Sequence, residues 1–213
     1  SMGFASDSIH VTSDAVFSLP EGRKEEGVRL LEKMGVDPSR PVGGFALRHW
    51  KGEKRFIREF ARTADRLKEQ FQAQIVFVPL QFPADGELSA QVAETMENRQ
   101  DVFILDQKFS TQEYQDLISS FHLLIGMRLH ALVFAAINDV PFMAISYDPK
   151  VDRFVDGMKG TVVNTIGRIT AEELTAMAEK LWNSDGKQGR EQIRALREEA
   201  RANIGRDLAL ATR

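Results

Sequence analysis

Residues 122–146 read HLLIGMRLHALVFAAINDVPFMAIS, and this stretch decides the fold class. Two short apolar runs, 122–126 and 141–146, have the length and composition of buried strands. The longer segment 128–138 between them fits a helix. A strand, a helix and a second strand joined by short connections are typical of a parallel β-sheet.

The same alternation extends over most of the chain. We expect an α/β fold, a Rossmann-like parallel sheet with helices on both faces. Thr111 is available as an N-cap and Gly35 suits a helix C-terminus. Three further strands are expected at 42–47, 75–80 and 102–105. The remaining helices are expected at 22–34, 54–70, 87–98, 111–120, 171–182 (after the cap Thr170) and 188–209. The last helix carries an apolar stripe that needs a partner, namely Ile193, Leu196, Ala200, Ile204 and Leu208.

The first twenty residues differ from the rest. Residues 1–20 are irregular, with a short apolar stretch at 16–19 that fits an edge strand or an interdomain connector. Ser1 before Met2 resembles the remnant of a cleaved tag. We therefore expect a connector and tag remnant at 1–20, and a Rossmann-like domain at 21–213 that ends in long helices.

Composition excludes several classes of protein. The chain has 213 residues, 43% of them hydrophobic, which is enough for a sizeable core. It has no cysteine, so disulfides, thiolate zinc sites and cysteine nucleophiles are excluded. A net charge of −3 argues against nucleic acid as a partner. No apolar run spans a membrane and no signal peptide is visible, so we expect a cytoplasmic protein.

Polar side chains follow four of the expected strands, where parallel sheets bind ligands. Several are cationic, which on an acidic protein indicates a small anionic ligand. In chain order these candidate residues are Arg48, Gln81, Arg128, His130, Tyr147 and Lys150.

Arg128 is the most informative of these residues. It begins a helix, where the dipole disfavours a cation but attracts an anion, so a bound phosphate or carboxylate would explain it. The alternative is an ion pair with an acid from another loop. Histidine side chains act as general acids and bases near neutral pH, and His130 fits either that role or a hydrogen bond to the backbone. Arg48 fits a bidentate anion clamp or an ordinary surface arginine.

Other polar residues fit structural roles better. Asp148 before Pro149 suits a helix N-cap. Asp148, Asp152 and Asp156 are spaced four residues apart and so share one face of a helix. Such a row is more typical of a solvated helix face than of a divalent-cation site. His122, inside an apolar run, is interpreted as a core histidine. No zinc spacing, P-loop or G-x-G-x-x-G motif occurs, so we expect neither a metal nor a cofactor.

Two stretches carry a family resemblance. Residues 125–136, IGMRLHALVFAA, and 140–151, VPFMAISYDPKV, resemble the polysaccharide pyruvyl transferases, most closely their bacterial cell-wall branch. Residues 45–50 (FALRHW) and 78–81 (VPLQ) are more weakly similar, and 12–14 (TSD) resembles the point where that family's chain leaves its first domain.

The resemblance implies a glycosyltransferase-B-like architecture, of which this chain is the donor-binding C-terminal domain. It implies transfer of the enolpyruvyl group of phosphoenolpyruvate to a sugar, forming a pyruvate ketal and releasing phosphate. Arg128 and His130 then match the family's donor-site motif, with Arg128 on the phosphate or carboxylate and His130 in proton transfer or phosphate contact. Gln81, Tyr147 and Lys150 join Arg48 as substrate contacts.

The implied partners are phosphoenolpyruvate, a cell-wall polysaccharide or lipid-linked sugar, and an N-terminal domain absent from this chain. A homo-oligomer stays open. Two other functions also stay open: a nucleotide-sugar glycosyltransferase of the same fold, and a non-catalytic anion-binding or assembly module.

Overall fold

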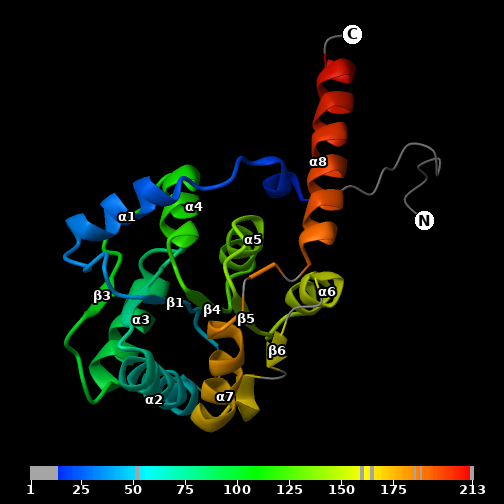
Figure 1. The fold of residues 1–213 in the computed structure, drawn as a ribbon. Coiled ribbons are helices and arrows are strands. Elements are labelled where there is room, and N and C mark those ends of the chain that lie inside the picture. Colours follow the sequence, from blue (N-terminus) through cyan, green and yellow to red (C-terminus); the bar gives the residue numbers. More distant parts are fainter. Residues whose placement is uncertain are drawn as a thin grey trace.

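The computed structural model describes residues 14–50, 53–158, 161–163, 166–184, 186–187 and 189–211. Its centre is a six-stranded parallel sheet in the order β3-β2-β1-β4-β5-β6 (Figure 1). This is the Rossmann order, in which the chain reverses direction across the sheet between β1 and β4. The strands are β1 (Val42–Ala46), β2 (Gln74–Phe77), β3 (Val102–Ile104), β4 (Leu123–Gly126), β5 (Phe142–Ile145) and β6 (Thr161–Val163).

The five expected strands are present, and β6 is an addition. Its sequence, Thr-Val-Val, holds only two apolar residues, which is too short an apolar run to indicate a strand. The strand expected at 75–80 ends earlier, at Phe77, although the Val78 N–H still donates to the Phe45 carbonyl at 2.8 Å. Pro79 follows and has no N–H to continue the ladder.

The helices lie where the apolar spacing places them, within a few residues. The α-helices are α1 (Lys24–Lys33), α2 (Glu53–Phe71), α3 (Ala84–Thr95), α4 (Thr111–Ser119), α5 (Leu129–Ile137), α6 (Pro149–Met158), α7 (Ala171–Trp182) and α8 (Arg190–Ala211). The short 3-10 helices are η2 (Ala15–Ser18) and η3 (Ile166–Arg168).

Two helix boundaries differ from expectation for identifiable reasons. The N-cap of α4 is Ser110 rather than Thr111, because Ser110 and Glu113 form a capping box. α3 was expected at 87–98 but ends at Thr95. The carboxylate of Asp65 accepts the backbone N–H groups of Glu97 and Asn98, which holds the chain outside the helix.

Side chains of β1 to β5 alternate between two cores. In β1, Val42 and Ala46 face one cluster, while Phe45 and, just beyond the strand, Leu47 face the other. The first cluster lies under α1, α4, α5, α6 and α8, and the second under α2, α3 and α7. Helices therefore cover both faces of the sheet, as expected (Figure 1).

The start of the described chain packs against its last helix. Residues 15–18 form η2 rather than an edge strand, and residues 1–13 lie outside the described residues. Arg197 of α8 donates to the Leu19 carbonyl at 3.1 Å. The apolar stripe of α8 buries Ile193 and Ala200 in this contact region, while Ile204 stays 37% exposed. Figure 1 shows α8 extending beyond the rest of the domain. No described helix is long and apolar enough to cross a membrane.

Candidate functional site

Parallel strands and short connections bring the predicted residues to one edge of the sheet. Arg48 follows β1, Gln81 follows β2, Arg128 and His130 follow β4, and Tyr147 and Lys150 follow β5. These four strands are adjacent in the order β2-β1-β4-β5. The edge includes the reversal point between β1 and β4, the usual ligand site of such sheets.

Arg128 is held by an acid in the first turn of α3, the helix that follows β2. Its Nε donates to Oδ2 of Asp85 at 2.9 Å, and its Nη2 donates to Oδ1 of Asp85 and, at 2.9 Å, to Oε1 of Gln81. The ion-pair alternative for Arg128 is thus present in the structure. In the described part of the chain Nη1 has no hydrogen-bond partner, so one nitrogen of the guanidinium stays available for a ligand.

Asp85 is a residue that the sequence analysis missed. Its side chain is fully buried in the first turn of α3. Its Oδ2 also accepts the backbone N–H groups of Leu80 and Gln81, at 3.1 and 2.9 Å. The carboxylate thereby locks the loop after β2 and the Arg128 side chain together. The available signal was an acid four residues after Gln81, at the start of a helix.

Arg48 and Tyr147 form a second directly bonded pair. Nη1 of Arg48 donates to the Tyr147 hydroxyl at 2.6 Å, and the guanidinium carbon lies 4.5 Å from the centre of the Tyr147 ring. Trp50 packs on the same ring, with centroids 5.3 Å apart. Because the partner of Arg48 is neutral, its positive charge is not offset by this contact.

His130 and Lys150 lie at the margin of this arrangement. Nε2 of His130 is 3.7 Å from a carboxylate oxygen of Asp14, and the imidazole is 57% exposed. Nζ of Lys150 is 4.0 Å from Oδ2 of Asp148, also at the surface. Asp148 caps α6 as expected, since its Oδ1 accepts the backbone N–H of Lys150 at 3.0 Å.

The structure therefore groups the six predicted residues unevenly. Gln81 is bonded to Arg128, Tyr147 is bonded to Arg48, and His130 and Lys150 each face a separate aspartate. Chemically, the edge offers directed guanidinium donors for an anion and an exposed imidazole for proton transfer.

The prediction that His122 is a core histidine was wrong. His122 is exposed, and its ring stacks on Trp182 with centroids 6.0 Å apart. Its Nδ1 accepts the backbone N–H of Val42 at 3.1 Å. Partial desolvation, with a smaller contribution from Lys24, lowers the pKa of His122 below the ordinary 6.5. Among the described residues, no group of three or more acidic or histidine side chains is arranged to hold a metal ion.

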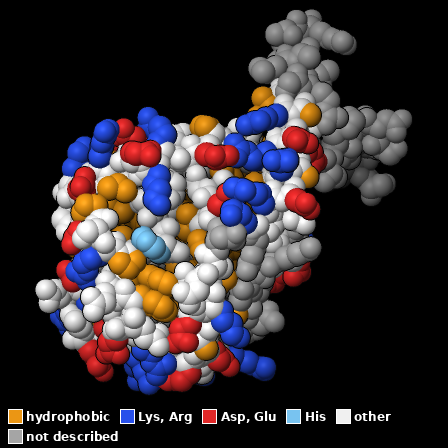
Figure 2. All heavy atoms as spheres, in the orientation of Figure 1, with side chains coloured by type: hydrophobic (Ala, Val, Ile, Leu, Met, Phe, Trp, Pro, Cys, Tyr) orange, Lys and Arg blue, Asp and Glu red, His pale blue; other side chains and the backbone are white. Residues whose placement is uncertain are grey.

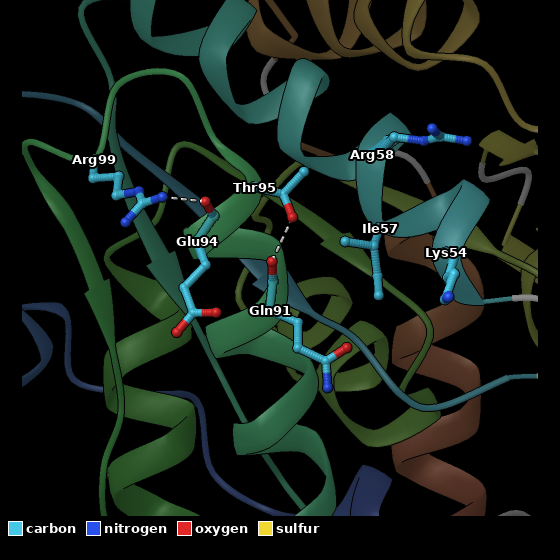
Figure 3. Close-up of a pocket in the computed structure, with 7 residues that line it drawn as sticks. All are labelled: Lys54, Ile57, Arg58, Gln91, Glu94, Thr95 and Arg99. Atoms are coloured by element: carbon cyan, nitrogen blue, oxygen red, sulfur yellow. Dashed lines mark hydrogen bonds between the residues drawn. The ribbon is translucent and has the colours of Figure 1, made fainter.

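Two of the hollows that lie away from the predicted residues are large enough to consider. One, of 780 Å³, lies between α2 and α3 (Figure 3). Arg99 donates to the Glu94 carbonyl there, and Thr95 donates to the Gln91 carbonyl at 2.7 Å. Most of its lining residues are exposed, so it is an open surface groove.

The other, of 540 Å³, lies beside α8. Four arginines line it, but Arg190 pairs with Asp139, and Arg197 pairs with Glu21 at 2.9 Å. Basic and acidic side chains are intermixed over this part of the surface in Figure 2. The charges therefore largely offset one another.

A family model described as polysaccharide pyruvyl transferase matches residues 1–149, more than half of the chain. The chain belongs to this family. The match to the pyruvyl transferases spans β1 to β5 and includes five of the six predicted site residues. Lys150 lies one residue beyond it. No curated protein sequence matches the chain.

Solved structures similar to this pyruvyl transferase chain share its fold. Escherichia coli ADP-heptose LPS heptosyltransferase II is 15% identical, with a TM-score of 0.63 over 76% of this chain and 52% of that one. Methanocaldococcus jannaschii UDP-GlcNAc 2-epimerase is 15% identical, with a TM-score of 0.64 over 91% of this chain and 56% of that one. The chain thus spans about half the length of each of these.

A third similar structure is itself a single domain. The C-terminal domain of a group 1 family glycosyl transferase from Francisella tularensis is 16% identical, with a TM-score of 0.55 over 87% of this chain and 97% of that domain. At these identities the likenesses establish the α/β Rossmann-like fold and no more.

Proposed function

We propose that this chain is the donor-binding domain of a phosphoenolpyruvate-dependent pyruvyl transferase. The observation that carries the proposal is the family match over residues 1–149, with Arg128-Leu129-His130 at the reversal point of the sheet. The acceptor is a sugar of a cell-wall polysaccharide or of its lipid-linked precursor. The reaction takes place in the cytoplasm and needs no cofactor besides its donor substrate.

The proposed reaction balances with this donor. The methylene carbon of phosphoenolpyruvate gains a proton, and its C2 forms bonds to two sugar oxygens. The bond between C2 and the phosphate ester oxygen breaks. Inorganic phosphate leaves with the proton of the second sugar hydroxyl. Arg48 and the free nitrogen of Arg128 bind the carboxylate and the phosphate, and His130 moves a proton. Lys150, Gln81 and Tyr147 support donor binding.

The length of the chain supports a role as one of two halves. It spans about half of the heptosyltransferase and the epimerase, and nearly all of the isolated Francisella tularensis C-terminal domain. In our proposal a preceding N-terminal domain binds the acceptor, and the exposed end of α8 around Ile204 contacts that domain.

The proposal is tested by calorimetric titration of the 213-residue chain with phosphoenolpyruvate, inorganic phosphate and a uridine diphosphate sugar. We expect selective binding of phosphoenolpyruvate, weakened by roughly tenfold or more in Arg48→Ala and in Arg128→Ala. Arg48→Ala is the safer variant for folding, because it leaves only a neutral hydroxyl unpaired.

A matched control is Arg99→Ala, which removes a surface guanidinium bonded to the Glu94 carbonyl in the groove of Figure 3. This variant should bind the donor as the parent chain does. Equal binding of phosphate and phosphoenolpyruvate, or no binding of either, contradicts the placement of the donor site in this half.

A nucleotide-sugar glycosyltransferase is the second candidate. It is favoured by the names of the similar structures, an ADP-heptose heptosyltransferase and a UDP-GlcNAc epimerase. In that case the uridine diphosphate sugar binds more tightly than phosphoenolpyruvate and is not displaced by it. A non-catalytic anion-binding module would instead bind phosphate and phosphoenolpyruvate equally.

A further inference from the structure

A small hollow adjoins the predicted donor residues but differs from them in chemistry. It has a volume of 240 Å³ and is lined by Trp50, Ser146, Tyr147, Asp148, Pro149, Asp152 and Ile166. We call it the Trp50 hollow. It lies between the loop after β1 and the N-terminus of α6, at the same edge of the sheet as Arg48. Its volume is just under the roughly 300 Å³ at which drug-sized sites begin, so it suits one small ring.

Trp50 gives this hollow an exposed aromatic surface. Its side chain is 38% exposed, and Ile204 is the other large hydrophobic residue exposed in the described part of the chain. The indole is supported by the Tyr147 ring, and that ring is held by the Arg48 guanidinium. An aromatic ring that is supported in this way loses little entropy when a ligand packs on it.

Two carboxylates complete the lining. The Asp152 side chain has no hydrogen-bond or ion-pair partner among the described residues, although the residue is half-buried. Oδ1 of Asp148 caps α6, and its Oδ2 is 4.0 Å from the Lys150 ammonium. Ionised carboxylates accept several hydrogen bonds each, so both retain capacity for hydroxyl donors.

We propose that the Trp50 hollow binds one pyranose ring of a carbohydrate. The ring's C–H face packs on the Trp50 indole, and its hydroxyl groups donate to Asp148 and Asp152. An exposed ring face beside carboxylate oxygens that can accept further hydrogen bonds is complementary to a molecule with one apolar face and a rim of hydroxyls. The two carboxylates repel a phosphate or a second carboxylate, so this hollow is unsuited to the anionic donor.

The proposal rests on the proposed function only where this sugar is one ring of the acceptor, the rest of which the preceding N-terminal domain binds. Binding of a neutral sugar by the hollow does not depend on phosphoenolpyruvate. The two can therefore be tested separately, because one titration uses sugars without donor and the other uses donor without sugars.

The test is an NMR titration of the indole N–H signals of the 213-residue chain. The chain has two tryptophans, and Trp182→Phe leaves one signal, which assigns Trp50. Trp182 is stacked on Phe71, at 4.5 Å between centroids, and on His122, away from the Trp50 hollow. The probes are the methyl pyranosides of glucose, galactose and mannose and their N-acetylamino derivatives, with glycerol as the non-cyclic control.

We expect at least one pyranoside to shift the Trp50 signal saturably, with a dissociation constant on the order of millimolar, while glycerol does not. Asp152→Asn and Asp148→Asn should each weaken the affinity by roughly threefold to tenfold, the worth of one hydrogen bond to a charged group. Asp148→Asn keeps the helix cap, because asparagine caps equally well. In Trp50→Ala, sugar affinity read from backbone signals of residues 147–152 should fall by about tenfold or more, and Trp50→Phe should retain part of it.

Three outcomes overturn the proposal. The Trp50 signal is unmoved by every pyranoside, or both aspartate variants bind as the parent does, or uridine monophosphate shifts the signal while the sugars do not. Loss of phosphoenolpyruvate binding in Arg128→Ala with sugar binding retained would separate the two sites, because Arg128 does not line the Trp50 hollow. Sugar binding without any phosphoenolpyruvate binding would keep this proposal and contradict the proposed donor.

Discussion

The carboxylate of Asp85 and the guanidinium of Arg128 join the start of α3 to the start of α5 across the end of β1. Asp85 is fully buried and the Arg128 side chain is only 17% exposed. A second arginine makes a similar crossing, since Arg48 after β1 reaches Tyr147 after β5 across the end of β4. These two contacts fix the loops that carry the predicted donor site.

Removing the Asp85 carboxylate should destabilise the folded chain. Asp85→Ala leaves a largely buried guanidinium and two loop N–H groups unpaired, so we expect a loss of about 3–5 kcal/mol in the free energy of unfolding. Urea unfolding measures this loss. Glu172→Gln is the control, because it breaks exposed ion pairs with Arg62 and Arg66 and should cost less than about 1 kcal/mol. Equal losses in the two variants would contradict a structural role for the Asp85–Arg128 pair.

His130 should affect turnover more than donor binding. In a chain that contains both proposed halves, His130→Gln removes proton transfer but keeps a polar side chain of similar size. We expect turnover to fall by roughly 10²–10⁴-fold while phosphoenolpyruvate affinity changes by less than about tenfold. Steady-state kinetics with phosphate release as the readout measures this. Turnover equal to that of the parent would remove His130 from the chemistry.

The histidine beside Trp182 makes folding stability depend on pH. Because the pKa of His122 is lowered in the folded state, the unfolded chain binds a proton more readily. Above the unfolded pKa of about 6.5, His122 is neutral in both states and does not reduce the free energy of unfolding. Below that pH the unfolded chain is favoured by protonation, so the free energy of unfolding falls. We therefore expect a steeper loss of stability between about pH 7 and pH 5 in the parent than in His122→Asn, measured by urea unfolding. Equal slopes in the parent and in His122→Asn would contradict this prediction.

Close packing of α1 on α4 depends on a glycine. A Cβ added at Gly27 would lie 1.9 Å from the Asp116 carbonyl oxygen. Helix propensity alone would make Gly27→Ala stabilising by about 1 kcal/mol, but this clash should reverse the sign and cost about 1–3 kcal/mol or more.

The control for that variant is Gly167→Ala, because a Cβ at Gly167 meets nothing within 4 Å. Its free energy of unfolding should stay within about 0.5 kcal/mol of the parent value. Thermal or urea unfolding of both variants decides the comparison. A stabilised Gly27→Ala would mean that α1 and α4 pack less closely than the structure has them.

The sequence by itself determined the fold class and the edge of the sheet where the candidate residues meet. Apolar runs such as 122–126 and helical spacing such as that of α2 are local signals, and parallel strands place the residues that follow them at one edge by topology alone. The helix cap at Asp148 is also local and was predicted for that reason.

Only the tertiary structure decided how those residues are paired. Asp85 and Arg128 are 43 residues apart, and Arg48 and Tyr147 are 99 apart, so no periodicity in the chain reveals either contact. The ring of His122 stacks on Trp182 of α7, which lies 60 residues later in the chain, so this contact has no local signal either. Each of these contacts depends on the order of the strands in the sheet. That order comes from packing both cores at once rather than from any one segment.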